Sequence, residues 1–229
     1  MSAEQTRLVW DWPLRLFHWA LAVTVVGAWL SGEYGGYDWQ DAHSYFGFTA
    51  LGLLIFRVVW GFVGPRHARF SALIPRFGAL LQELRNLPRR GGRESVGHSS
   101  LASLAVMAML LAVSVQAVSG LFMTDDIFFD GPWRMMVEGD TAKIFEEAHH
   151  TASTIIAVLV GLHVFAIAYY RFRKGRRLLG PMIHGRKSAS VVSEEDAIPG
   201  SRTAVAFVII AAVAALTWFL IFELPGMVD

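Results

Sequence analysis

The chain has 229 residues, of which 54% are hydrophobic, and its formal net charge at pH 7 is +1. It contains no cysteine, which excludes iron–sulfur clusters, covalently attached c-type haem and any disulfide framework. Any redox cofactor must therefore be held by histidine, methionine or tyrosine.

Five apolar stretches follow one another along the chain, and each is long enough to cross a bilayer. They are Leu14–Leu30, Tyr45–Val63, Leu101–Met123, His149–Tyr170 and Ala204–Phe222. We predict an all-α integral membrane protein, in which residues 1–187 form a four-helix transmembrane bundle and residues 203–229 add a fifth, C-terminal transmembrane helix. Residues 66–98 form a basic loop that contains a short amphipathic helix, Phe77–Leu87, and residues 188–202 form a cytoplasmic linker.

The basic residues are concentrated at alternate ends of these predicted helices. Eighteen of the 20 lie in segments 1–15, 57–98 and 171–202, and only Arg134 and Lys143 lie elsewhere. The positive-inside rule then places the N-terminus in the cytoplasm and, after five crossings, the C-terminus in the periplasm. The first apolar stretch is not followed by a cleavage site of small residues, so we interpret it as a retained helix.

Two histidines of the fourth apolar stretch, His149 and His163, are fourteen residues apart. In an α-helix this spacing brings both rings to within about 40° of the same face, roughly 21 Å apart along the axis. Ionisable residues inside a membrane span are costly and are candidates for a functional role. The spacing therefore indicates two metal centres in series across the bilayer.

The predicted direction of each helix assigns a depth to every membrane histidine. His43 and His149 lie towards the outer side, whereas His18 and His163 lie towards the inner side. Each pair comes from two helices, as a cofactor clamped inside a bundle requires. Imidazole is a good ligand for haem iron, and two axial histidines favour electron transfer over oxygen binding. His150 competes with His149, but its offset from His163 points it to another face.

Two arginines near the inner ends are candidate cofactor contacts. Arg57 either extends along the bilayer to the interface or binds a haem propionate or a quinone-site group. Arg15, one turn before His18, is a similar candidate. Of the remaining histidines, His67 and His184 are interpreted as parts of a basic surface, while His98 could approach the inner haem or a quinone or have no such role.

Three segments carry a resemblance to a known family. Val9–Trp19, Arg57–Phe70 and the pair Glu147–His149 with Leu162–His163 resemble, in collinear order, the bacterial cytochrome b561 and nickel–iron hydrogenase b-type cytochrome family. The likeness extends from about Trp10 to Lys187. It implies a four-helix core in the bacterial inner membrane that holds two haem b groups by bis-histidine ligation and exchanges electrons with a quinone, ubiquinone or menaquinone.

The expected function is an electron relay across the bilayer, as the electron-transfer component of a quinone-linked oxidoreductase. The predicted outer surface carries twelve acidic and two basic residues, so a basic periplasmic partner such as a c-type cytochrome is expected, or a redox enzyme subunit. The other expected partners are membrane lipid and a quinone. We expect no binding to nucleic acid. The alternatives are a superoxide-to-quinone oxidoreductase of the same family and a histidine-based metal or proton transporter.

Overall fold

The structure is a computed structural model that describes residues 5–89, 91, 94–124 and 129–228. Asp125 and Asp126, two of the acidic residues counted above, lie outside these residues, as does Asp229. Five helices of the described residues are long and apolar enough to cross a membrane, which confirms the predicted number: α1 (Trp12–Tyr34), α2 (Gln40–Val63), α4 (Ser100–Gly120), α5 (Gly139–Arg173) and α7 (Thr203–Trp218), which continues in a π-helical turn, Phe219–Glu223.

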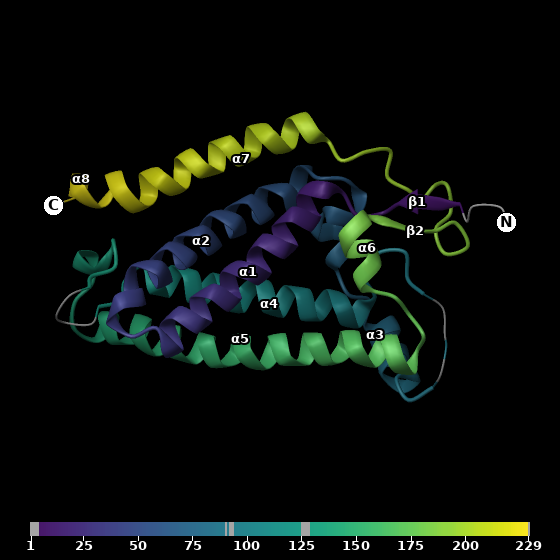
Figure 1. Ribbon diagram of the computed structural model, residues 1–229, viewed down its shortest axis with the longest axis horizontal. Helices are drawn as coiled ribbons and strands as arrows, with labels where there is room; N and C mark the ends of the chain where they lie inside the picture. Colours follow the sequence, from purple (N-terminus) through teal and green to yellow (C-terminus); the bar gives the residue numbers. More distant parts are fainter. Residues whose placement is uncertain (1–4, 90, 92–93, 125–128, 229) are drawn as a thin grey trace. The chain divides into compact units, whose positions relative to one another are not determined.

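The shorter elements lie before, between and after these helices (Figure 1). The helices are α3 (Phe77–Asn86), which confirms the predicted amphipathic helix, α6 (Leu179–His184) and α8 (Pro225–Val228). Single 3-10 turns occupy Tyr37–Trp39, Arg66–Ala68, Phe70–Leu73 and Arg134–Met136. The two strands are β1 (Thr6–Leu8) and β2 (Arg186–Ser188).

The chain divides into two compact units, and each long helix contributes one end to each of them. The first unit comprises the described residues up to Leu16 together with Val58–Met109 and Leu159–Ala206. The second comprises Phe17–Arg57, the described residues of Leu110–Val158, and those from Phe207 onwards. The two units are described separately.

A small antiparallel sheet in the first unit joins the two strands, from Thr6 opposite Ser188 to Leu8 opposite Arg186 (Figure 1). The carbonyl of Gly185 extends this pairing, because it accepts the backbone N–H groups of Val9 and Trp10 at 2.9 and 3.0 Å. Gly185 has a φ of 81°, a conformation that glycine adopts at little cost. The sheet therefore brings the start of α1 to the end of α6.

Asp11 ties the start of α1 to the end of α2 within the first unit. Its Oδ1 accepts the backbone N–H of Leu14 at 3.0 Å, as an N-cap does, and the indole N–H of Trp60 at 2.9 Å. Asp11 and Trp60 are both almost completely buried. A buried carboxylate needs such donors, so this contact fixes where α1 begins.

Residues 188–202 belong to the first unit and pack within it. Val192 and Ile198 are buried there, and the N–H of Ile198 donates to the carbonyl of Leu8 at 2.9 Å. His67 is also buried, and its Nε2 donates to the carbonyl of Asp196 at 2.7 Å. His67 is therefore not an exposed part of a basic surface, as we had interpreted it: the backbone carbonyl of a distant loop satisfies its ring.

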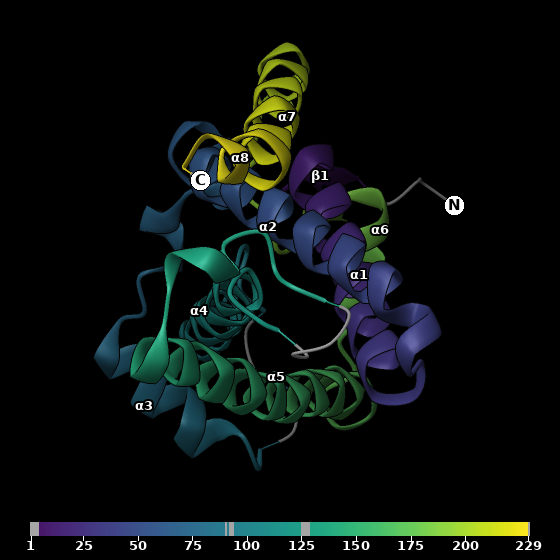
Figure 2. The same cartoon turned by 90° about the vertical axis from the view of Figure 1, so that its left-hand side faces the viewer.

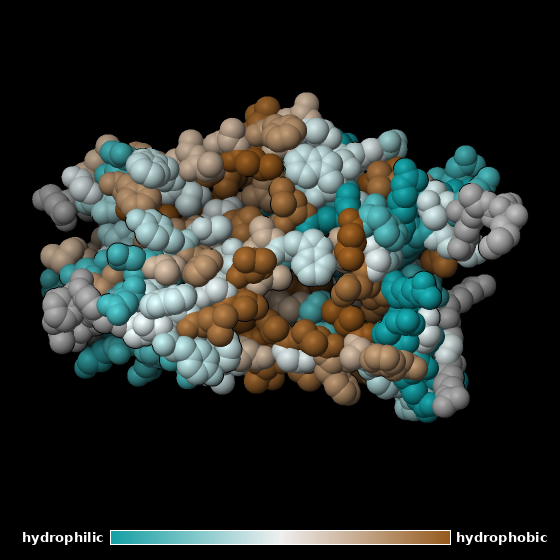
Figure 3. Space-filling view, in the orientation of Figure 1, coloured by the Kyte–Doolittle hydropathy of each residue, from teal (hydrophilic) through white to brown (hydrophobic). Residues whose placement is uncertain are grey.

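The fifth long helix packs on α2 within the second unit, as both views of the ribbon show (Figures 1 and 2). A Cβ on Gly52 would lie 3.1 Å from Thr217 Oγ1, so glycine permits this close approach. The π-helical turn leaves the carbonyl of Leu220 to accept the indole N–H of Trp133 at 2.8 Å. Hydrophobic side chains cover much of the long helices on the face drawn in Figure 3, and hydrophilic ones gather where α6 and β2 lie.

Candidate haem-binding site

His43 of α2 and His149 of α5 face one another in the second unit. Their ring centroids are 6.2 Å apart, with an angle of 72° between the ring planes. Two imidazoles bound to opposite sides of one metal ion would have centroids about 6 Å apart, since each metal–nitrogen bond is about 2 Å long. The two rings are therefore spaced as axial ligands of a single metal.

The His43 ring is held by α1. Its Nδ1 lies 2.8 Å from the carbonyl oxygen of Ala28 and 3.5 Å from the hydroxyl of Ser31. A carbonyl only accepts, so Nδ1 carries the proton and donates it. Gly32 lies against the same ring, because a Cβ there would lie 2.9 Å from both Nδ1 and Cε1 of His43.

The His149 ring is held by α4 in the same way. Its Nδ1 lies 3.1 Å from the carbonyl oxygen of Gln116 and 3.3 Å from the hydroxyl of Ser119. A Cβ on Gly120 would lie 3.1 Å from Cε1 of His149. Both histidines therefore donate from Nδ1 to a helix carbonyl, which leaves Nε2 with a lone pair for a metal.

The two arrangements share one sequence pattern, a serine followed by glycine near the end of a helix. Each serine hydroxyl donates to the carbonyl four residues earlier at 2.7 Å and lies 3.1 Å from the carbonyl three residues earlier. The latter carbonyl accepts the histidine, and the glycine stands four residues after it. The missing side chain therefore opens the second lone pair of that carbonyl to the ring.

Two further observations test whether a cofactor fits between the rings. The side-chain Nε2 of Gln116 lies 2.9 Å from Nε2 of His149, where it donates to the lone pair that a metal would take. Its Oε1 is buried without a hydrogen-bond partner among the described residues. Gly47, one turn after His43, faces space in which a Cβ would meet nothing within 4 Å. The open space at Gly47, the lone pair on Nε2 of His149 and the Gln116 amide that could move aside are compatible with a metal held in a flat organic ring.

The other predicted pair, His18 and His163, is divided between the two units. His18 belongs to the second unit and its ring meets that of Trp19 edge-on, with centroids 5.0 Å apart. His163 belongs to the first unit. Both are half-buried. Their pairing stays a prediction from depth.

The two predicted arginine contacts differ in their surroundings. Arg57 is only 4% exposed, so its side chain is enclosed by protein and does not extend to the surface as the first alternative required. Arg15 is half-buried, and its guanidinium donates to the carbonyl of Ile183 at the end of α6. A buried guanidinium is costly unless anionic or carbonyl oxygens surround it.

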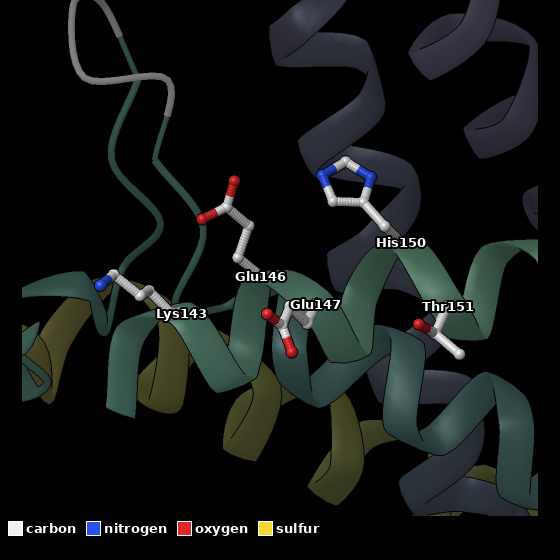
Figure 4. Close-up of a pocket in the computed structure, with 5 residues that line it drawn as sticks. All are labelled: Lys143, Glu146, Glu147, His150 and Thr151. Atoms are coloured by element: carbon white, nitrogen blue, oxygen red, sulfur yellow. The ribbon is translucent and has the colours of Figure 1, made fainter. Parts of the chain in front are cut away.

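The structure places His149, and not its neighbour His150, against His43. His150 is exposed and lines a shallow hollow of about 450 Å³ together with Lys143, Glu146, Glu147 and Thr151. Figure 4 shows that all five side chains project from α5. The hollow is a surface feature with acidic and basic groups beside the candidate ligand.

The remaining histidines lie in the first unit. The ring of His98 packs against that of Trp10 with centroids 4.7 Å apart, and His67 meets the same indole edge-on at 6.2 Å. Nδ1 of His184 accepts the backbone N–H of Arg186 at 3.1 Å, across the turn at Gly185. Sequence reasoning missed these contacts because they join segments far apart in the chain or depend on the turn.

Together, the fold and the facing histidines define a helical membrane protein with an imidazole pair suited to a metal-containing cofactor. The prokaryotic cytochrome b561 family model matches residues 9–185, and the chain belongs to this family. It is a b-type cytochrome of a bacterial membrane that takes part in electron transfer, and its cofactor is haem b.

Relatives with a curated description cover most of the chain. A probable Ni/Fe-hydrogenase B-type cytochrome subunit of Azotobacter chroococcum mcd 1 is 26% identical over 208 residues, covering 77% of this chain and 86% of the relative. The corresponding protein of Azotobacter vinelandii is 25% identical with the same coverage. That of Rhizobium leguminosarum bv. viciae is 22% identical over 214 residues, covering 80% of this chain and 90% of the relative.

Proposed function

We propose that this protein carries electrons across the membrane between a quinone and a redox partner on the periplasmic side, through two haem b groups. The observation that carries the proposal is the facing pair of His43 and His149, whose ring spacing and Nδ1–H donation suit axial ligation of one iron. These two histidines hold the outer haem.

The haem, when bound, supplies reversible one-electron chemistry. The chain's own contribution is to hold both imidazoles in the tautomer that presents Nε2, and to fix each ring against a helix backbone. With one imidazole from His43 and one from His149, a haem iron held here would have no open coordination position, which would favour electron transfer over oxygen binding.

The inner haem is held by His18 and His163, which the predicted depths pair on the opposite side of the membrane. Arg57, enclosed by protein, and Arg15, one turn before His18 in the sequence, would bind its propionates or a quinone-site group. Two haems at different depths divide the bilayer into short electron-transfer steps.

The orientation follows from the charges. The N-terminus lies in the cytoplasm and the C-terminus in the periplasm, because 18 of the 20 basic residues lie at the ends assigned to the cytoplasm. The described part of the outer surface includes Glu146 and Glu147 beside His150. This acidic surface steers a basic partner, such as a c-type cytochrome.

A hydrogenase is a second possible redox partner, supported by the names of the relatives, which are hydrogenase cytochrome subunits. Reduction of the purified protein by a hydrogenase and by a c-type cytochrome, measured side by side, distinguishes the two. Cationic residues beside the outer site would favour the superoxide alternative. Of the two basic candidates, Lys143 pairs with Asp140 at 3.6 Å and Arg134 donates to the carbonyl of Val137 at 2.8 Å.

Reduced-minus-oxidised absorbance spectra of the purified protein test the proposal. We expect a b-type spectrum with two haems per chain. His43→Ala should remove the outer haem and keep the inner one, and His163→Ala should do the reverse. His150→Ala is the matched control, since this ring lies 6.3 Å from that of His149 but on the surface; it should keep both haems.

The proposal fails if His43→Ala and His149→Ala both retain two haems, or if His150→Ala loses one. Retention of two haems in His163→Ala would refute the inner assignment alone. Quinone reduction that depends on added superoxide, in the absence of any protein partner, would favour the alternative oxidoreductase.

A further inference from the structure

Helix α3 in the first unit presents three different faces. Towards the protein it turns Glu83, whose carboxylate oxygens accept the backbone N–H groups of Ser100 and Leu101 at 3.0 and 2.9 Å. One turn further on, the carbonyl of Leu87 accepts the Tyr169 hydroxyl at 2.6 Å. These contacts fix the rotation of α3 about its own axis.

A second face is apolar and exposed. Phe77, Leu81 and Leu84 follow one another at helical spacing and are 74%, 40% and 44% exposed. Ile74, just before the helix, is 72% exposed. The third face is polar: Gln82 and Arg85 are both exposed, and lie about 80–140° around the helix from Phe77. An apolar strip between a protein-bound face and a polar face is typical of a helix lying in a membrane interface.

The ends of the neighbouring spans place this helix near the membrane interface. The apolar exposed face of α5 continues to Phe172, which is 87% exposed, and basic residues follow it directly. Lys174 donates from Nζ to the carbonyl of Asn86, the last residue of α3, at 2.8 Å, and to that of Arg89. Because Glu83 caps the first residues of α4, α3 lies where two membrane spans end.

We propose that α3 and the end of α5 form a binding site for an anionic phospholipid of the cytoplasmic leaflet. The acyl chains contact Phe77, Leu81 and Leu84, and the headgroup phosphate is bound by Arg85 and Arg89. Both arginines are exposed at the C-terminal end of α3, where Arg89 donates to the Asn86 side chain at 3.1 Å. Clustered arginines beside an apolar interfacial strip select an anionic headgroup over a zwitterionic one. This site is independent of the haem assignment.

The cysteine-free sequence allows a direct test with single spin labels. Leu81→Cys and Gln82→Cys place a nitroxide on the apolar and the polar face, 100° apart around the helix. The purified holoprotein is reconstituted in vesicles of phosphatidylcholine alone or with phosphatidylglycerol. Collision with dissolved oxygen and with a water-soluble nickel chelate reports the depth of each label.

With phosphatidylglycerol we expect the label at residue 81 to be accessible to oxygen and protected from nickel, and the label at 82 to be accessible to nickel. In phosphatidylcholine alone the label at 81 should lie closer to water. Adding Arg85→Gln should raise the phosphatidylglycerol fraction needed for half-maximal immersion by about fivefold. Arg177→Gln, at an exposed position in the same unit, is the control and should leave it unchanged.

Equal immersion of residue 81 in both vesicle types would overturn the anionic headgroup site, as would an Arg85→Gln effect no larger than that of Arg177→Gln. Exposure of residue 81 to nickel in both vesicle types would overturn the interfacial placement itself. Haem content measured on the same samples confirms that each variant is folded.

Discussion

Replacing Gly32 with alanine tests the outer haem site through a single methyl group. The added Cβ would lie 2.9 Å from both Nδ1 and Cε1 of His43. Heavy atoms in favourable contact are about 3.5–4.0 Å apart, so the ring must retreat by roughly 0.6–1.1 Å. The helix backbone of α1 has no comparable freedom, and the imidazole therefore moves.

The consequence follows from the hydrogen bond that the ring makes. Nδ1 of His43 lies 2.8 Å from the Ala28 carbonyl oxygen. A retreat of that size stretches the separation to roughly 3.4–3.9 Å, beyond the range of a hydrogen bond. Loss of such a contact behind a metal ligand lowers affinity by about 10–100-fold. Gly120→Ala should have a smaller effect, because its Cβ would lie 3.1 Å from His149.

The assay is transfer of haem from the purified protein to an excess of apomyoglobin. We expect one of the two haems of Gly32→Ala to leave about 10–100 times faster, with the other unchanged. Gly161→Ala is the control, since a Cβ there would meet nothing within 4 Å. Equal transfer rates in both variants would show that the His43 ring is not held against Gly32 in the haem-bound protein.

Three further outcomes are expected. Lys187→Met removes the partner that Glu94 contacts at 3.0 Å in a largely buried pair, and should lower the free energy of unfolding by about 2–4 kcal/mol; an unchanged thermal midpoint in detergent would contradict this. Trp60→Phe deprives Asp11 of an indole donor and should lower the free energy of unfolding by about 1–3 kcal/mol, measured in the same way. An unchanged thermal midpoint would show that water replaces the donor. Electron transfer to a basic c-type cytochrome should slow steeply as salt rises from about 50 to about 500 mM, and a flat salt response would exclude steering by the acidic surface.

The membrane spans could be predicted from the sequence because a long apolar segment inside a bilayer has one low-energy conformation, the α-helix. A helix satisfies all of its own backbone groups, so about 20 apolar residues specify it without help from distant residues. The amphipathic pattern of α3 is equally local. By contrast, the strands β1 and β2 are three residues each, and pair across almost the whole length of the chain. No local sequence pattern predicts that two such short, distant segments pair.

The histidines illustrate the same boundary within one candidate site. Depth along a helix is a local property, and it led to His43 and His149, which the structure brings face to face. The carbonyls of Ala28 and Gln116 could not be identified this way, because every residue has a carbonyl and only packing decides which one is reached. The repeated serine–glycine pair was the available signal, and two dipeptides are too short to be recognised as a repeat.

The choice of a carbonyl as the partner of each imidazole has a physical reason. A carboxylate would hold the ring more strongly, but within a membrane span it would add a charge that is costly to bury. A helix carbonyl has a second lone pair beyond the one used in the helix, and it carries no net charge. That lone pair is normally covered by the side chain one turn later, which is why Gly32 and Gly120 stand where they do. Glycine near the end of a helix thus allows an uncharged carbonyl to orient a ligand. Replacing this glycine should weaken haem binding more than it destabilises the helix.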